Sequence, residues 1–242
     1  MEKYAVVTGA DRGLGFALTM ELVKDGYTVF AGRYLTDWPA LDELPEETRN
    51  QVIVLELDVS DEASVRDAAE RIAARTDRID LLVNNAGIAG NQEGNIHGGI
   101  DFERLQTMYR VNAVGPLRMA EALTGLLLAG ERKLVVNISS EAGQINQTWR
   151  EGWYGYCMSK AALNIQSNIL HNELRKHGGK VLVIHPGWMR SYMGGKLSEH
   201  GAISTEEAAT GIAGVIAAYL DETEDRAHPA FRDYTGAEMS WT

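Results

Sequence analysis

Cysteine is nearly absent from the sequence. Cys157 is the one cysteine among 242 residues, so the chain has no pair for an internal disulfide. This usage is typical of a reducing compartment. The six histidines show no close pairing, and with a single cysteine they offer no zinc-ligand set. We therefore expect a protein without disulfides or a metal site.

Long hydrophobic runs and basic charge are also lacking. No apolar stretch approaches the ~20 residues needed to span a bilayer, and Met1-Glu2-Lys3 leads into a strand-like segment without a signal-peptide pattern. Lysine and arginine number 23 against 34 aspartates and glutamates, a net charge of −11. Nucleic acids and anionic membranes attract basic surfaces, so we expect neither as a partner. The expected location is the cytoplasm.

What the sequence does have is an alternation of strand-like and helical segments with short connections. It predicts an α/β fold: a doubly wound parallel sheet of about seven strands with helices on both faces. Because no linker or repeat interrupts the pattern, we expect one domain over residues 1–242. The expected strands are 4–7, 27–31, 52–57, 79–83, 134–138, 181–184 and an edge strand from 231. The expected helices include 61–75, 102–129 and one from 204.

A glycine-rich turn joins the first expected strand to the first expected helix. Residues 8–15, TGADRGLG, follow the apolar run, and Leu14, Leu18 and Leu22 then recur at helical spacing. Glycine permits a tight turn and a close backbone approach to a pyrophosphate, whose charge meets the helix N-terminus. The glycine spacing is three residues and then one, rather than one and then two. Its place between strand and helix predicts dinucleotide binding.

The second expected strand ends in an arginine. An acid at this point selects the free 2′-hydroxyl of NAD, whereas an arginine can pair with the 2′-phosphate of NADP. The chain has Gly32-Arg33 there and no carboxylate until Asp37. Arg12 in the glycine-rich turn favours the phosphate interpretation. The alternative is that Arg33 is a solvated surface residue.

Tyr156 and Lys160 are the central chemical motif. Residues four apart share a helix face. A phenol has a pKa near ~10, and a nearby ammonium lowers that pKa, which makes proton transfer workable at neutral pH. The spacing alone fits two solvated residues equally well. Tyr154 is followed four residues later by Met158, so we discount it as the acid–base group.

Small and polar residues follow other expected strands. Asp58-Val59, the segment 84–87 (NNAG) and Ser139-Ser140 suit a cofactor that lies across the sheet edge. Asn112 falls within helix 102–129, where an amide is unfavourable unless it has a purpose or a partner. Residues 88–101 are interpreted either as a wall of a substrate cleft or as a surface loop.

The remaining aromatic and reactive residues are open to two interpretations. Trp149, Trp153 and Trp188 are candidates for an apolar substrate wall or for core packing. His185 is expected to pack at a strand end rather than to act as a base. Cys157 is expected to be a small packed residue.

Together these motifs resemble the short-chain dehydrogenase/reductase family. They follow in the family's order over nearly the whole chain: the turn 8–15, Asp58, the segment 84–87, Asn112, Ser140, Tyr156 with Lys160, and Pro186-Gly187. The resemblance implies a Rossmann fold and hydride transfer between a nicotinamide and a carbonyl or secondary alcohol of a small molecule. It implies NADP(H) as the preferred cofactor, NAD(H) as the alternative, and a homodimer or homotetramer.

The resemblance also implies roles for single residues. Tyr156 is the general acid or base, Lys160 lowers the pKa of that phenol, Ser140 holds the substrate oxygen, and Asn112 supports a water. Besides Tyr156 and Lys160, the residues implied to bind the cofactor are Gly9, Arg12, Gly13, Leu14, Gly15, Arg33, Asp58, Val59, Asn85, Ala86, Gly87, Pro186, Gly187, Met189 and Ser191.

Residues 186–195, PGWMRSYMGG, are similar to a subgroup of small carbonyl reductases. Members of that subgroup often have Thr-Asp where this chain has Ser191-Tyr192. Ser191 still offers a hydroxyl to the cofactor amide. Tyr192 replaces a charge with an aromatic ring, so the subgroup's substrate preference does not carry over.

A non-catalytic NADP(H)-binding sensor of the same fold is the alternative function. Such a protein can lose the tyrosine or the lysine without losing the fold. Asn112, Ser140, Tyr156 and Lys160 are all present, which favours the enzyme.

Overall fold

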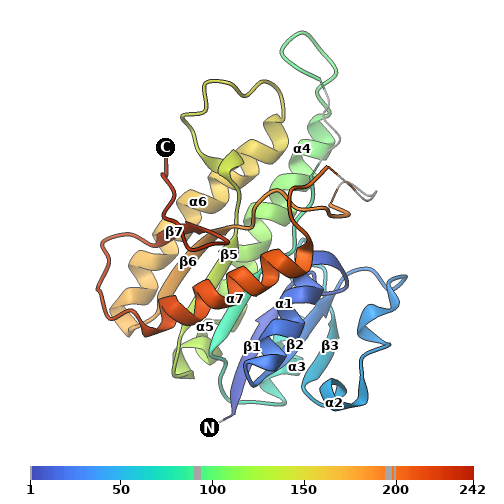
Figure 1. Cartoon of the computed structure of the whole chain (residues 1–242), viewed down its shortest axis with the longest axis vertical. Coiled ribbons are helices and arrows are strands. Elements are labelled where there is room, and N and C mark those ends of the chain that lie inside the picture. The colour runs from blue at the N-terminus through green and yellow to red at the C-terminus, as the bar shows by residue number, and fades with distance from the viewer. Residues whose placement is uncertain (1, 90–93, 194–197, 199) are drawn as a thin grey trace.

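Seven parallel strands form one sheet in the order β3-β2-β1-β4-β5-β6-β7 (Figure 1). The computed structural model describes residues 2–89, 94–193, 198 and 200–242. The predicted doubly wound α/β fold is confirmed. The strands are β1 (Lys3–Val7), β2 (Tyr27–Arg33), β3 (Val52–Glu56), β4 (Leu81–Asn84), β5 (Leu134–Ile138), β6 (Lys180–His185) and β7 (Ala230–Asp233).

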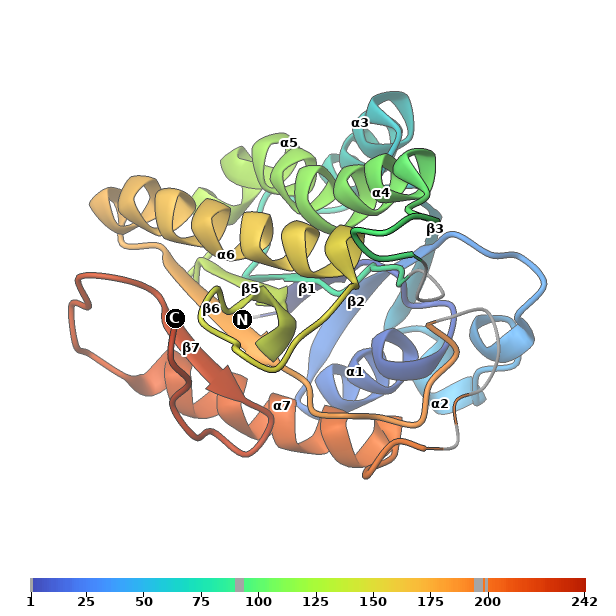
Figure 2. The same ribbon diagram turned by 90° about the horizontal axis from the view of Figure 1, so that it is seen from above.

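Helices cover both faces of this sheet. Figure 2 shows α3, α4, α5 and α6 on one side and α1 and α7 on the other. Each face of the sheet has its own hydrophobic core, and successive strand residues point into opposite cores. Ala5 and Val7 pack towards α1 and α7, whereas Val6 packs towards α3 and α5. The helices are α1 (Gly13–Lys24), α2 (Glu46–Arg49), α3 (Glu62–Ala73), α4 (Phe102–Tyr109), α5 (Gly115–Ala129), α6 (Tyr154–Leu174) and α7 (Thr205–Asp221).

The chain reverses its direction of travel across the sheet between β1 and β4. It builds β1, β2 and β3 outwards on one side and then returns to place β4 on the other side of β1. In open parallel sheets, ligands bind in the crevice beyond the carboxyl ends of the strands at such a reversal. The backbone N–H of Thr8 donates to Val83 O at 3.0 Å, which holds the two strand ends together. The glycine-rich turn therefore lies beside residues 85–87.

The expected single helix over 102–129 is corrected by the structure. α4 ends at Tyr109, residues Arg110–Val114 form a π-helical turn, and α5 begins at Gly115. Within this turn the Gly115 N–H donates to the carbonyl of Arg110, five residues back. Such turns are often found at functional sites, and Asn112 lies inside this one.

Candidate active site

Tyr156 and Lys160 lie in the first turns of α6, above the carboxyl end of β5. Lys160 is buried, and its Nζ donates to the carbonyl of Ile138 at 2.8 Å. The same Nζ lies 5.7 Å from the centre of the Tyr156 ring. Because one backbone carbonyl holds the ammonium, the helix and the strand fix it beside the phenol.

Burial dominates the acid–base properties of this pair. It raises the pKa of Tyr156 to about 12 and lowers the pKa of Lys160 to about 8. Hydrogen bonding with Ser140 and the charge of Arg150 act against the rise in the Tyr156 pKa, whereas the charge of Glu141 adds to it. The expected lowering of the phenol pKa by the ammonium is therefore wrong in direction, because desolvation is the largest effect on Tyr156. The phenol keeps its proton at neutral pH, as a proton donor requires.

Asn112 joins three segments around the pair. Its Oδ1 accepts from the backbone N–H of Ile88 at 2.8 Å, and its Nδ2 donates to Ile88 O at 2.8 Å and to Ser159 Oγ at 3.0 Å. A Cβ on Gly87 would lie 3.4 Å from Asn112 Oδ1 and 3.8 Å from Lys160 Nζ. The amide therefore has the partners that its mid-helix position demands. Its role in holding a water stays a prediction.

The two serines after β5 have different partners. Ser139 Oγ donates to Asn164 Oδ1 at 2.6 Å in a buried bond, so this hydroxyl is committed to the interior. Ser140 Oγ accepts from the Ala142 N–H at 3.1 Å and donates to Glu141 Oε2 at 2.6 Å. Hydrogen bonding with Ser140 also acts on the Tyr156 phenol, which favours Ser140 as the site serine.

The glycine-rich turn packs too tightly for side chains. Gly9 has φ +63°, and a Cβ there would lie 2.9 Å from Ala86 Cα. A Cβ on Gly15 would lie 2.5 Å from Asn85 Nδ2 and would overlap the carbonyl of Gly9. Gly13 also has a positive φ, +55°. Gly9 and Gly15 leave no room for a Cβ because the turn lies against the segment after β4, whereas at Gly13 it is the positive φ that favours glycine.

The N-terminus of α1 offers free donors to an anion. No side chain caps this helix, and its first turn carries no acidic residue. Its first N–H groups have no partner within the helix and concentrate positive charge. Phosphate groups bind at such ends. The predicted cofactor residues Gly13, Leu14 and Gly15 form this first turn.

Arg12 and Arg33 are engaged by other side chains in this structure. The Arg33 guanidinium bonds to Asp42 at 2.9 Å and to Glu56 at 2.8 Å. The Arg12 guanidinium lies 5.0 Å from the Trp38 ring centre and 3.8 Å from Asp11. Arg33 is therefore not the free surface residue of the alternative interpretation. To bind a phosphate as predicted, it must exchange a carboxylate for it.

The residues predicted after β3 do not all present side chains to the crevice. Asp58 Oδ1 accepts from the Ser60 N–H at 2.8 Å. Val59 is buried, and a Cβ on Gly115 would lie 2.8 Å from Val59 Cγ2. Val59 thus packs against α5, which leaves only its backbone for a ligand.

The segment after β6 packs against residues that follow it in the chain. Pro186 is buried, Gly187 has φ +82° and lies against Ile203 and Tyr234, and Met189 pairs with Ile203. Ser191 O accepts from the Ser198 N–H at 2.9 Å. Residues 90–93 of the predicted cleft wall, and Gly194 and Gly195 of the subgroup motif, lie outside the described residues.

Trp149, Trp153 and Trp188 are all exposed, and Trp153 also contacts Tyr156. Trp153 has φ +57° at the start of α6, and its ring packs edge-on against Tyr156 with centroids 6.0 Å apart. Trp149 and Trp188 are exposed, so the core-packing interpretation does not hold for them. Tyr192 packs edge-on against Trp38 at 4.8 Å, which joins the segments after β2 and β6.

Sequence reasoning missed Thr8 and Glu141. The buried Thr8 hydroxyl accepts from the N–H groups of Asn85 and Ala86 at 3.0 and 2.9 Å. Glu141 accepts from Ser140 and pairs with Arg150 at 3.0 Å. A carboxylate directly after a candidate catalytic hydroxyl was the available signal for Glu141. Thr8 gave none, because its partners are 77 and 78 residues away.

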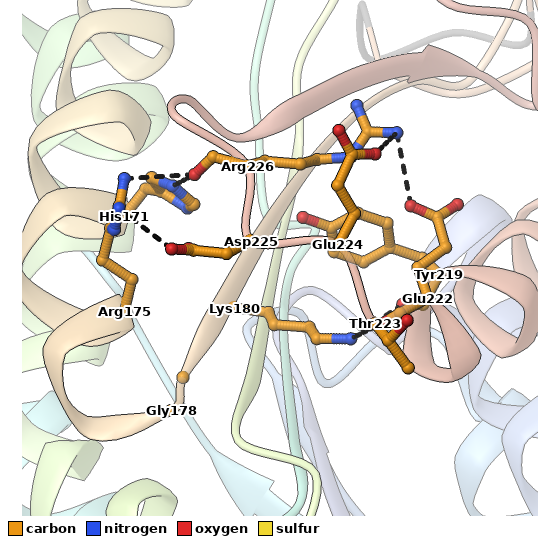
Figure 3. A pocket seen from close by; sticks show the side chains of 11 residues that line it. His171, Arg175, Gly178, Lys180, Tyr219, Glu222, Thr223, Glu224, Asp225 and Arg226 are labelled. Carbon is orange, nitrogen blue, oxygen red and sulfur yellow. Dashed lines mark hydrogen bonds and ion pairs between the residues drawn. The ribbon is translucent and has the colours of Figure 1, made fainter.

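A cavity of about 180 Å³ lies elsewhere, between the C-terminal ends of α6 and α7 (Figure 3). Lys180 Nζ donates there to the carbonyls of Tyr219 and Leu220 at 3.2 and 3.3 Å, and Arg226 pairs with Glu222 at 3.3 Å. None of the predicted site residues lines this cavity. Its charged groups pair mainly with one another and with the end of α7, although Arg226 Nε, Glu222 Oε2 and His171 Nδ1 have no hydrogen-bond partner among the described residues.

The described residues hold neither a membrane-spanning helix nor a metal-binding cluster. No helix in this part of the chain combines the length and apolarity needed to cross a membrane. Within the same residues, no three His, Cys, Asp or Glu side chains gather where they could hold a metal ion.

A parallel sheet with a glycine turn at its reversal point, and a half-buried tyrosine beside a buried lysine, define a dinucleotide-dependent dehydrogenase class. A family model described as short chain dehydrogenase matches residues 3–202, and the chain belongs to this family. It is similar to the 1-hydroxy-2-glutathionyl-2-methyl-3-butene dehydrogenase of Rhodococcus, with 28% identity over 237 residues and 98% of each chain covered.

Two further relatives extend this comparison. Rat estradiol 17-beta-dehydrogenase 2 is 34% identical over 193 residues, which are 77% of this chain and 48% of that protein. The chain thus spans about half the length of that relative. The solved NADPH-bound carbonyl reductase from chicken fatty liver superposes with a TM-score of 0.86 at 28% identity, over 99% of both chains.

Lys160→Met should stabilise the protein at neutral pH. The pKa of Lys160 falls from its ordinary 10.5 to about 8, so its charged form costs roughly 3 kcal/mol when folded. Loss of its hydrogen bond to Ile138 costs about 1 kcal/mol of stability. The net increase in the free energy of unfolding is therefore about 2 kcal/mol. The unfolded chain binds more protons between pH 8 and 10.5, so wild-type stability rises across that window and the gain shrinks. Urea unfolding of both proteins at pH 7 and pH 10 measures this, and an equal gain at both values contradicts it.

Proposed function

We propose that this protein is an NADP(H)-dependent oxidoreductase that transfers hydride between the nicotinamide and a carbonyl or secondary alcohol of a small molecule. The observation that carries the proposal is the buried Lys160 ammonium 5.7 Å from the Tyr156 ring, beside Ser140 and the reversal point of the sheet. The relatives named as dehydrogenases and the NADPH-bound carbonyl reductase support it.

We expect a dinucleotide to lie beyond the carboxyl ends of the strands, at the reversal point of the sheet. The uncapped start of α1 offers backbone donors to a pyrophosphate, and the backbone of residues 85–87 borders the same crevice. Gly87 lies beside Lys160, since a Cβ on Gly87 would be 3.8 Å from Lys160 Nζ, and we expect these two residues to hold the nicotinamide ribose. When bound, the cofactor supplies or accepts the hydride.

The protein's own side chains transfer the proton and stabilise the negative charge that develops on the substrate oxygen. During carbonyl reduction the substrate oxygen becomes alkoxide-like, and hydroxyl groups aimed at it stabilise that charge. The Tyr156 phenol, protonated at neutral pH because its pKa is about 12, donates its proton to this oxygen. Lys160 then stabilises the phenolate left behind. In alcohol oxidation the same groups act in reverse.

Tyr156→Phe should lower carbonyl reduction by about 10²- to 10⁴-fold, the typical contribution of general acid catalysis. NADPH binding should persist because the ring and the fold remain. Tyr154→Phe is the matched control, since Tyr154 lies on the same helix but is exposed. The measurement is NADPH absorbance with a panel of small aldehydes and ketones, together with NADPH titration of each variant.

If the protein is a non-catalytic sensor, the same assay should show NADPH binding without NADPH oxidation. Tight NADPH binding by the wild type without oxidation by any carbonyl compound would reject the enzyme and favour the sensor. Near-normal turnover by Tyr156→Phe would reject the acid–base assignment alone.

We also propose that Arg12 and Arg33 bind the 2′-phosphate of NADP(H). Asp42 competes for Arg33, and its side chain is 59% exposed, so a phosphate can displace it into water. Arg33→Asp should weaken NADPH relative to NADH by about 10- to 100-fold, the range of a lost charged hydrogen bond. Asp42→Asn should tighten NADPH, because the competing charge is gone. Parallel titrations with both cofactors test this; unchanged ratios in both variants contradict it.

We further propose that the protein is a homo-oligomer joined through the outer face of α5 and α6. Leu117 on α5 and Ile165 and Ile169 on α6 are 48%, 60% and 54% exposed, and exposed apolar side chains are candidates for an interface. Ile165→Glu combined with Ile169→Glu should convert the species seen by light scattering to a monomer. Ile145→Glu, at a 79% exposed loop position, is the control. A monomeric wild type would refute the proposal.

A further inference from the structure

The hydroxyl hydrogen of Ser140 has two competing acceptors. One is Glu141 Oε2, to which Ser140 Oγ donates at 2.6 Å. The other is the Tyr156 oxygen, whose charged form is favoured by hydrogen bonding with Ser140. A hydroxyl donates one hydrogen at a time. What holds Glu141 therefore decides how much of the Ser140 donor is left for the reacting groups.

The segment 144–150 holds Glu141 in place. Arg150 Nη2 donates to Glu141 Oε1 at 3.0 Å, and Gln147 Nε2 donates to the Glu141 carbonyl at 2.7 Å. Arg150 Nε in turn donates to Gln147 Oε1 at 2.7 Å. The Arg150 side chain is only 14% exposed. Water therefore screens this ion pair less than it screens a surface pair.

His185 is the other titratable group that faces Glu141. Its Nδ1 lies 3.3 Å from Glu141 Oε2, but without the alignment of a hydrogen bond, and that buried nitrogen has no other partner among the described residues. Burial lowers the pKa of His185, although the charges of Glu141 and Asp233 oppose this. The imidazole is therefore neutral at neutral pH. Arg150 is left as the cation that offsets Glu141.

We propose that the Glu141–Arg150 ion pair acts through the Ser140 hydroxyl to set how readily Tyr156 gives up its proton. This inference rests on the function proposed above. Glu141 and Arg150 are positioning residues: they touch the hydroxyl or its partner, not the substrate. No covalent bond changes, because the Ser140 hydroxyl only rotates from Glu141 to the oxygen that gains negative charge.

The charges around Tyr156 give the two members of the pair opposite effects. Glu141 disfavours the phenolate and Arg150 favours it. On its own helix, Cys157 also disfavours the phenolate, and the Lys160 ammonium is the nearby cation. Removing the Glu141 charge should make Tyr156 a stronger acid, and removing the Arg150 charge should make it a weaker one. A purely structural role for the pair predicts no such opposition.

The test measures the Tyr156 phenol directly. All nine tyrosines are replaced by 3-fluorotyrosine, whose phenol is more acidic, and the Tyr156 signal is assigned by its loss in Tyr156→Phe. Titration followed by fluorine NMR should show a lower midpoint in Glu141→Gln, by about one pH unit. The midpoint should be higher in Arg150→Gln and near the wild-type value in the double variant.

Glu222→Gln is the matched control. Glu222 is also a partly buried carboxylate paired with arginine, with a side chain 28% exposed against 37% for Glu141. It lies in the cavity of Figure 3, at the opposite end of α6 from Tyr156. It should leave the Tyr156 midpoint unchanged. Glu141→Gln with an unchanged or higher midpoint would overturn the inference, and Arg150→Gln tests it independently should Glu141→Gln not fold.

Turnover is measured separately from this titration. In alcohol oxidation, the acid limb of the pH–rate profile should move with the phenol midpoint in each variant. A wild type that oxidises no alcohol and reduces no carbonyl would refute the proposed function. The NMR midpoints would still decide whether the ion pair controls Tyr156.

Discussion

The candidate site depends on the desolvation of one ammonium group beside one phenol. Lys160 is buried with the Ile138 carbonyl as its hydrogen-bond acceptor, and its pKa of about 8 still leaves it mostly charged at neutral pH. A buried charge is costly unless something holds it. Strand β5, helix α6 and the turn at Asn112 surround it. The packing of these elements therefore keeps the Lys160 ammonium away from the water that would otherwise solvate it.

Much of the fold followed from local pattern. The alternation of apolar runs and amphipathic stretches predicted the strands closely, and β5 has the predicted bounds 134–138. The stripe Leu14, Leu18 and Leu22 is buried as helical spacing requires. Burial on a sheet or a helix face has a fixed period, so these features depend on neighbours in sequence. The pairing of Tyr156 with Lys160 depends on the same one-turn spacing.

Features set by distant residues were out of reach. Arg33 meets Glu56 because β2 and β3 pair in parallel, and Asp42 reaches Arg33 from the connection between these strands; the sequence alone specifies neither contact. The relative size of the effects on the Tyr156 pKa could not be predicted either, because desolvation depends on all the groups packed around the phenol. The π turn at Asn112 is a third case, since its partners Ile88 and Ser159 come from segments 24 and 47 residues away.

The π turn has a consequence for how the neighbouring helices pack. Each helical residue advances the face by about 100°, so one residue inserted in a turn rotates everything beyond it by that angle. α4 packs against α6, whereas α5 packs against α3 and β4. A straight helix of this length would present one stripe to one neighbour. The inserted residue lets the continuous helical segment from α4 to α5 pack against different neighbours before and after the π turn. The polar Asn112 lies at this turn.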